Sequence, residues 1–369
     1  MSVRRPKHLA ALAATAVASG ILAAPAPAAP TPFLDHFTTT TVLASAVPAS
    51  GDQNPYGVAV VRRSVGDLHR GDVLVSDFNN GQNLQGTGSS IVEISPSGAM
   101  HVFAVVPPPP GDPAVGLTTA LVVLRSGFVI VGNLPAPGGM AHNASAGALT
   151  VLDPTGHVVE TIAGGDINGP WDMTAVEHGH HAVLFVTNVL NRTVKADGAT
   201  VDGGTVVRIT LATGRDKVPV VTSNQVIATG FDERTDPAAL VVGPTGVGLG
   251  RDGTLYVADS VNSRIAAIPD ALTRTTPIGN GGITLTSGGA LNDPLGLTIA
   301  PGGDVISANG NDGRVVETTP AGDQVATKVL MDPGAGDLFG LAIAPHGRGL
   351  YFVNDVGSGP QANSLDLLH

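Results

Sequence analysis

The chain has 369 residues, 43% of them hydrophobic and only 13% charged, and its 49 glycines and 28 prolines favour turns over helices, as in a folded β protein. The formal net charge of −11 argues against nucleic acid or an anionic membrane as a partner, because both require a positive surface. The absence of cysteine excludes disulfides, thiolate metal sites and a cysteine nucleophile.

The N-terminal residues 1–29 are predicted to be a signal peptide. Arg4, Arg5 and Lys7 form a basic start, an apolar stretch follows, and small residues at 26–29 offer a cleavage site. Export to the periplasm or the extracellular space is therefore expected, with no membrane span left after cleavage. The alternative is a retained anchor, for which the apolar stretch is short. Loss of the three basic residues takes the formal charge from −11 to −14.

The remaining chain repeats one pattern six times: an apolar strand, a turn, and a second apolar strand that ends in Asp or Asn. The residues that end these second strands are Asp77, Asn133, Asn188, Asp259, Asn309 and Asn354. They are spaced 56, 55, 71, 50 and 45 residues apart, and repetition at this length indicates units of one small sheet each.

Each unit offers four strand candidates, which predicts an all-β, six-bladed β-propeller of four-stranded antiparallel blades in a single domain, residues 30–369. The predicted blades cover about 54–106, 115–163, 168–229, 243–286, 292–330 and 336–369. The last unit has only three strand candidates, so the β-branched segment Thr38–Val47 is expected to complete it and close the ring. The alternative is an open sheet or a sandwich.

Two segments carry a family resemblance. Residues 293–303 read Asp-Pro-Leu-Gly-Leu-Thr-Ile-Ala-Pro-Gly-Gly, and residues 253–265 begin Gly-Thr-Leu-Tyr-Val-Ala-Asp. Both resemble NHL repeats, within the wider group of gluconolactonase/regucalcin-like six-bladed propellers. The resemblance implies the fold more strongly than an activity.

Antiparallel blades place the loops before each first strand and after each second strand on one rim, here called the upper face; the opposite rim is the lower face. The six Asp/Asn residues that end the second strands are expected on the upper face. Their side-chain oxygens are candidate ligands for Ca²⁺ or another divalent cation. The alternative is that they hydrogen-bond to nearby turns, one in each blade.

Long loops are predicted to gather on the upper face, at 78–89, 134–147 and 189–204, with two further segments at 107–117 and 230–243. Such loops usually carry binding, although they could also be insertions without a role. The expected ligand is a small molecule, a glycan or a protein. Candidate ligand-binding residues are Asn54, Trp171, Asn188, Arg192 and Asp259, and weaker catalytic candidates are Glu233, Asp236 and His142.

Two function classes follow. The first is a binding or scaffold module. The second is a divalent-metal-dependent hydrolase or lactonase, for which the resemblance implies a Glu, Asn and Asp set at the channel mouth. Asn188 and Asp259 match the last two, but residues 54–58 (Asn-Pro-Tyr-Gly-Val) lack the glutamate, which Glu233 would have to replace from a loop. A propeller lyase of the streptogramin-inactivating kind is a third reading, and only His142 is expected on the right rim.

A histidine cluster lies elsewhere. His178, His180 and His181 follow one another in a turn between a first and a second strand, which places them on the lower face. Histidine is a common transition-metal ligand, but three neighbours in one turn need distant carboxylates to complete a site.

Overall fold

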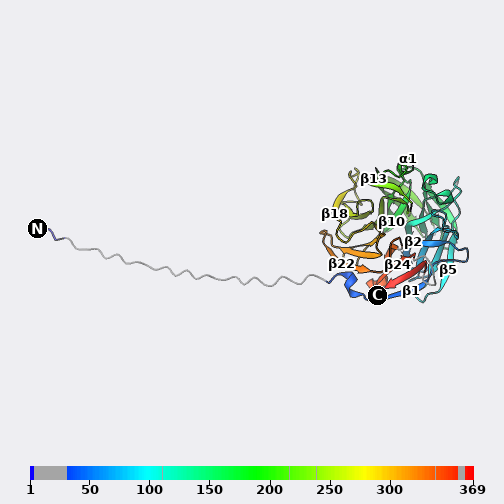
Figure 1. Cartoon of the computed structure of the whole chain (residues 1–369), viewed down its shortest axis with the longest axis horizontal. Coiled ribbons are helices and arrows are strands. Elements are labelled where there is room, and N and C mark those ends of the chain that lie inside the picture. Colours follow the sequence, from blue (N-terminus) through cyan, green and yellow to red (C-terminus); the bar gives the residue numbers. More distant parts are fainter. Residues whose placement is uncertain (4–30, 110, 216, 238, 337, 356–361) are drawn as a thin grey trace. The chain divides into compact units, whose positions relative to one another are not determined.

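Each repeat unit of the sequence folds into one antiparallel sheet, and six such sheets surround a common axis (Figure 1). The structure is a computed structural model that describes residues 1–3, 31–109, 111–215, 217–237, 239–336, 338–355 and 362–369. The predicted signal peptide therefore lies almost wholly outside the described residues. In the described part of the chain, no helix is both long and apolar enough to cross a membrane.

Five blades are continuous in the sequence. Blade 1 comprises β2 (Gln53–Val60), β3 (Val73–Asn79), β4 (Ser90–Ile94) and β5 (Met100–Val105); blade 2 comprises β6 (Leu117–Val123), β7 (Val129–Asn133), β8 (Ala148–Leu152) and β9 (Val158–Ala163). Blade 3 comprises β10 (Pro170–His178), β11 (His181–Asn188), β12 (Val201–Gly214), β13 (Lys217–Asp236) and β14 (Leu240–Val242). Blade 4 comprises β15 (Pro244–Leu249), β16 (Leu255–Asp259), β17 (Arg264–Ile268) and β18 (Ile283–Ser287); blade 5 comprises β19 (Pro294–Ile299), β20 (Val305–Asn309), β21 (Arg314–Thr318) and β22 (Gln324–Val329).

Blade 6 is assembled from both ends of the described domain. Its order is β1 (Thr40–Ser45), β25 (Ser364–Leu368), β24 (Leu350–Asn354) and β23 (Leu338–Ile343). The predicted ring closure is thus confirmed: β1 is the outermost strand and pairs antiparallel with β25. The backbone N–H groups of Thr38 and Thr39 extend this pairing by donating to the carbonyl oxygen of His369, at 3.2 and 3.0 Å.

The closure extends further along the chain than the sequence indicated. The short 3₁₀ helix η1 (Phe33–His36) packs against blade 5, where both carboxylate oxygens of Glu317 accept backbone N–H bonds from Phe33 and Leu34, at 2.7 and 2.8 Å. The Leu34 side chain is fully buried. The N-terminal segment is therefore anchored to two blades.

The innermost strands form the wall of the central channel. β2, β6, β10, β15, β19 and β23 each contact the next in this order, and β23 contacts β2. The third residues of β15, β19 and β23 are glycines that lie against the backbone of a neighbouring inner strand. A Cβ at Gly296, for example, would collide with the carbonyl oxygen of Phe339. Glycine at these positions allows the six blades to approach one another.

Blade 3 differs from the sequence prediction. Residues 230–243, predicted to be a loop, instead continue β13 to Asp236 and return as β14. Glu233 pairs with Val201 of β12, so the long β12–β13 hairpin reaches the upper face. The sequence pattern breaks at Gly203 and Gly204, and the β12–β13 pairing shifts its register on both sides of Gly204, so this extension of the hairpin was not predicted.

Three further short helices lie in the upper loops. η2 (Pro137–Gly139) and η3 (Ala141–Asn143) follow β7, α1 (Thr193–Ala196) follows β11, and α1 contacts η3. A further 3₁₀ turn, η4 (Pro345–Gly347), lies between β23 and β24.

Candidate functional site

Aromatic side chains fill the upper part of the channel. Tyr56 of β2 stacks on Phe339 of β23 with ring centroids 4.2 Å apart, and the ring of Trp171 of β10 lies 5.7 Å from that of Tyr56. Phe78 of β3 also stacks on Tyr56, with ring centroids 4.6 Å apart. These rings belong to one buried cluster with residues of blades 1, 3, 5 and 6, so side chains occupy the axis at this level.

The aromatic packing leaves Trp171, a predicted ligand-binding residue, with little surface for a ligand. Trp171 is only 3% exposed, and its ring contacts other side chains of the cluster and not the solvent. Burial likewise raises the pKa of Tyr56, with further contributions from the charges of Asp355 and Asp236. Aromatic side chains therefore close the upper end of the channel, and the carboxylates of Asp355 and Asp236 lie close enough to affect Tyr56.

The channel is open on the lower face. A cavity of about 920 Å³ is lined by the second halves of the six inner strands. Three arginines line it from the loops on the lower face: Arg62 and Arg70 between β2 and β3, and Arg125 between β6 and β7. At its inner end is Asp172, whose two oxygens accept N–H bonds from Met173 (2.7 Å) and from Val247 of the next blade (3.0 Å). Burial raises the pKa of Asp172 to about 8.

Sequence reasoning did not identify Asp172. Its position in the inner strand is occupied by glycine in four other blades, at Gly57, Gly246, Gly296 and Gly340. The sequence does carry a sign of it, because an aspartate stands at Asp172 where four other repeats have glycine. The difference becomes apparent only when the first strands of the repeats are aligned, whereas the repeated Asp or Asn is in the second strands.

Of the six Asp/Asn residues that end the second strands, five are bonded within their own blades. Asn133 accepts from the Ala148 N–H (2.5 Å), Asn188 from the Asn168 N–H (3.0 Å) and Asn309 from the Asn292 N–H (3.1 Å); Asn354 donates to Asp366 (3.4 Å), and Asp259 accepts from Arg264 Nε (2.6 Å). These bonds fix the turns beside each strand.

Asp77 is the exception. It is fully buried, and within the described residues neither carboxylate oxygen has a hydrogen-bond partner. The same end of blade 1 holds two further acceptors, Oδ1 of Asn54 and Oδ1 of Asn79, that have no partner in the described part of the chain; these residues are 6% and 3% exposed. β2 and β3 bring them together, since Pro55 pairs with Asp77 and Gln53 with Asn79.

The electrostatics of this site disfavour an isolated charge. Burial raises the pKa of Asp77 well above its ordinary value, and the negative charges of Asp52 and Asp355 raise it further. Asp52 itself accepts bonds from the hydroxyl groups of Ser89 and Ser90, at 3.0 and 2.8 Å. The upper end of blade 1 therefore holds several side-chain oxygens close together, and those of Asp77 receive no hydrogen bond from the described residues.

The Glu, Asn and Asp set implied by the family resemblance does not fit these residues. Asn188 and Asp259 are engaged as described, and Asp259 has a guanidinium partner in Arg264. Glu233, the suggested substitute, is fully buried and accepts from the Thr193 hydroxyl at 2.8 Å, and burial raises its pKa to about 8. Glu233 thus links the start of α1 to β13, and its Oε2 has no hydrogen-bond partner among the residues that the structure describes.

The other predicted residues are dispersed over the upper face. Arg192 is exposed and pairs with Asp202 at 2.6 Å, and His142 is exposed on η3. Asp236 pairs with Arg234 at 2.5 Å. Burial, followed by the charge of Asp236, raises the pKa of Asp293 to about 6.

The three turn histidines are on the lower rim, as the strand order predicts. His178 ends β10 and His181 begins β11, and these two residues face each other across the hairpin.

Comparison with known proteins places the fold. No protein-family profile matches the sequence. No curated protein matches it significantly. Solved structures do: a calcium-binding protein, regucalcin, from Agrobacterium tumefaciens strain C58 (TM-score 0.56, 16% identity, 90% of this chain and 93% of that one), a luciferin-regenerating enzyme (0.56, 14%, 87% and 92%) and a gluconolactonase from Xanthomonas campestris (0.54, 16%, 89% and 88%).

At these identities the similarity establishes architecture. The chain is a six-bladed β-propeller whose structural neighbours are gluconolactonase- and regucalcin-like propellers. What those proteins bind or transform does not transfer with the fold.

Proposed function

We propose that this protein is an exported binding module, and that a divalent cation such as Ca²⁺, bound at Asp77, stabilises the upper face that meets its partner. The observation that carries the cation is the set of acceptors without donors in Asp77, Asn54 and Asn79. Export rests on the predicted signal peptide of residues 1–29.

The energetic argument is direct. A buried carboxylate without a partner costs several kcal/mol, so it either takes up a proton or acquires a cation. Carboxylate and amide oxygens are the ligands that Ca²⁺ prefers. A bound Ca²⁺ would satisfy Asp77 and offset the repulsion from Asp52 and Asp355.

The burial of Asp77, Asn54 and Asn79 favours a structural cation in a binding protein over a catalytic cation in a hydrolase. A catalytic metal keeps a coordination position open to substrate. Asp77, Asn54 and Asn79 are each at most 6% exposed, and Phe78 of the same strand packs on Tyr56. A cation here would be enclosed by protein and would act on the loops above it.

Those loops are the proposed binding surface. They follow β3, β7 and β11, and η3 and α1 pack together within them. Exposed polar side chains such as Arg192 and His142 face solvent there. The chemistry of this surface suits a polar partner such as a glycan, a protein or a polar small molecule.

The test is thermal unfolding of the chain from Pro30 onward, after chelation and with added Ca²⁺. We expect a saturable rise in melting temperature, because a ligand that binds only the folded state stabilises it by about 2.7 kcal/mol at one hundred times its Kd. The isosteric variant Asp77→Asn should lose this response.

The matched control is Asp259→Asn, which changes the equivalent aspartate of blade 4. Asp259 already has Arg264 as its partner, so this variant should be less stable but should keep the Ca²⁺ response. An equal Ca²⁺ response in Asp77→Asn, or no response in the parent protein, would refute the cation site. Lactone hydrolysis that requires Ca²⁺ and Asp77 would replace the binding role with the hydrolase.

A further inference from the structure

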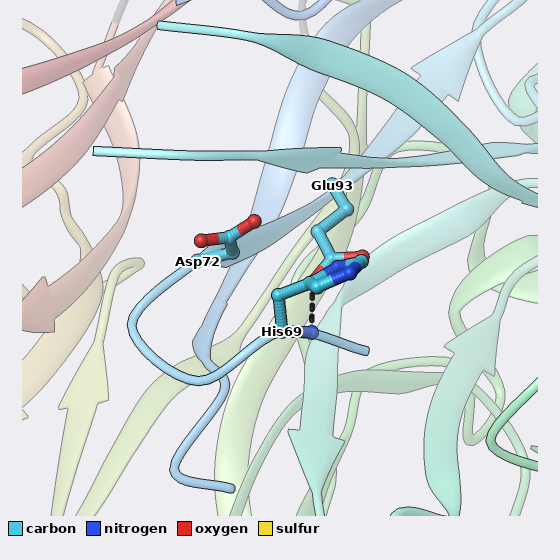
Figure 2. A group of neighbouring side chains, drawn as sticks. All are labelled: His69, Asp72 and Glu93. Atoms are coloured by element: carbon cyan, nitrogen blue, oxygen red, sulfur yellow. Dashed lines mark hydrogen bonds and ion pairs between the residues drawn. The ribbon is translucent and has the colours of Figure 1, made fainter. Parts of the chain in front are cut away.

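A second cluster of ligand-type side chains lies on the lower face of blade 1, away from Asp77. His69 and Asp72 belong to the loop between β2 and β3, and Glu93 belongs to β4 (Figure 2). One potential ligand atom from each lies within 4.8 Å of the others. A turn brings the first two together, since the Asp72 N–H donates to the His69 carbonyl at 3.1 Å.

Glu93 is the fixed member of the cluster. Its side chain is 0% exposed, and its Oε1 accepts the backbone N–H of His69 at 2.7 Å (Figure 2). The Nδ1 atom of the same histidine lies 3.7 Å from Oε1. On the other side, Nε2 of His101 lies 3.2 Å from Oε2, because Glu93 and His101 are cross-strand neighbours in β4 and β5.

Blade 5 has a glutamate, Glu317, at the position equivalent to Glu93, and its contacts are those of a structural residue. Glu317 occupies the same position in β21, one residue before the end of the strand, and pairs with Ile306 as Glu93 pairs with Leu74. Both of its oxygens accept backbone N–H bonds. Glu93 has one such bond, and the remaining groups around it are imidazoles and a carboxylate.

We propose that His69, Asp72 and Glu93 bind a divalent transition-metal ion of the zinc type. Bonds of about 2.0–2.2 Å to nitrogen and oxygen place tetrahedral ligand atoms about 3.3 Å apart. Nδ1 of His69 lies 3.7 Å from Oε1 of Glu93, all three ligand atoms lie within 4.8 Å of one another, and the His69 side chain is 66% exposed. His101, whose Nε2 lies 3.2 Å from the second oxygen of Glu93, would act as a positioning residue, as outer partners of metal ligands commonly do.

The ion would have a defined structural effect. It would fasten the β2–β3 loop to β4, and this loop carries Arg70 and Gly71 of the cavity lining. With three protein ligands, a tetrahedral ion would take water as its fourth ligand. The site therefore couples metal binding to the shape of the lower channel mouth, independently of the proposed function.

The test uses tag-free protein in which His178, His180 and His181 are replaced by Gln, so that the turn histidines cannot contribute. Zn²⁺ is titrated by calorimetry, and Co²⁺ is used as a spectroscopic substitute. We expect one ion per chain and the visible absorption of four-coordinate Co²⁺. His69→Gln and Glu93→Gln should each weaken Zn²⁺ binding at least tenfold.

Two controls keep the result decisive. His157→Gln removes an exposed histidine whose Nδ1 lies 3.8 Å from Asp153, a similar pair without a third ligand, and it should leave binding unchanged. Glu93→Gln retains an acceptor for the His69 N–H, and circular dichroism checks its fold; if it misfolds, the exposed His69→Gln carries the test. No Zn²⁺ binding by the parent, or equal binding by His69→Gln, would overturn the proposal.

Discussion

Asp172 illustrates how one side chain can replace a backbone contact. Where other inner strands have glycine and touch their neighbours directly, β10 has a carboxyl group that reaches the Val247 N–H of blade 4. The group is 8% exposed, and burial raises its pKa to about 8. It therefore holds a proton at neutral pH in the folded state.

This proton predicts a pH dependence of stability. Unfolded aspartate releases its proton near a pH of about 4, so between about 4 and 8 the folded state binds more protons. The free energy of unfolding should fall as pH rises through this window, by up to about 1.4 kcal/mol per pH unit from this group. Urea unfolding at pH 5 and pH 8 measures it.

The comparison variant is Asp172→Asn. It cannot titrate, so its stability should fall less between pH 5 and pH 8 than that of the parent, although loss of one acceptor lowers its stability at both values. An identical pH dependence in the two proteins would show that Asp172 does not hold the proton.

Residue patterns were predictable where they repeat. The Asp or Asn at each second-strand end follows from the sequence, but the difference between Asp77 and the others depends on hydrogen-bond partners elsewhere in each blade, such as Asn168 for Asn188 and Arg264 for Asp259. Glu93 and His101 lie four residues on either side of Ser97 in a tight hairpin, which makes them predictable as neighbours. His69 joins them only through the fold of its loop.

At the scale of elements, the N-terminal segment carries more of the closure than one strand. β1 supplies the outer strand of blade 6, and η1 adds a buried leucine and two bonds to Glu317. The strand was predictable from its β-branched residues. The helix was not, because its stability comes from a glutamate almost 300 residues away.

Leu34→Ala tests the contribution of η1. The side chain is 0% exposed and packs with Ile306 and Phe352, so its removal should cost about 2–5 kcal/mol in the free energy of unfolding. Urea denaturation gives the value. A loss below about 0.5 kcal/mol, the level of an ordinary surface change, would mean that η1 is not part of the closed ring.

For the whole molecule, the contact of inner strands limits what the ring tolerates. Gly296 of β19 lies against the Phe339 carbonyl of β23, and an added Cβ has no space there. Gly296→Ala should therefore destabilise the protein by about 1–3 kcal/mol or more, because two blades must separate. Differential scanning calorimetry should show a lower melting temperature.

Gly302→Ala provides the matched control. This glycine is in an exposed turn of the same blade, and a Cβ there meets nothing within 4 Å. Its stability should stay within about 0.5 kcal/mol of the parent. Equal effects of the two substitutions would argue against a tightly closed channel wall.

Because β25 lies between β24 and β1, blade 6 cannot form until residues 364–368 have been synthesised. Until then the N-terminal strand has no partner, and blade 1 has no completed neighbour on one side. Until synthesis is complete, the ring stays open between blade 5 and blade 1, and its free sheet edges can pair with other chains. Any factor that binds β1 during synthesis would therefore act at the step that decides between a sealed ring and aggregation.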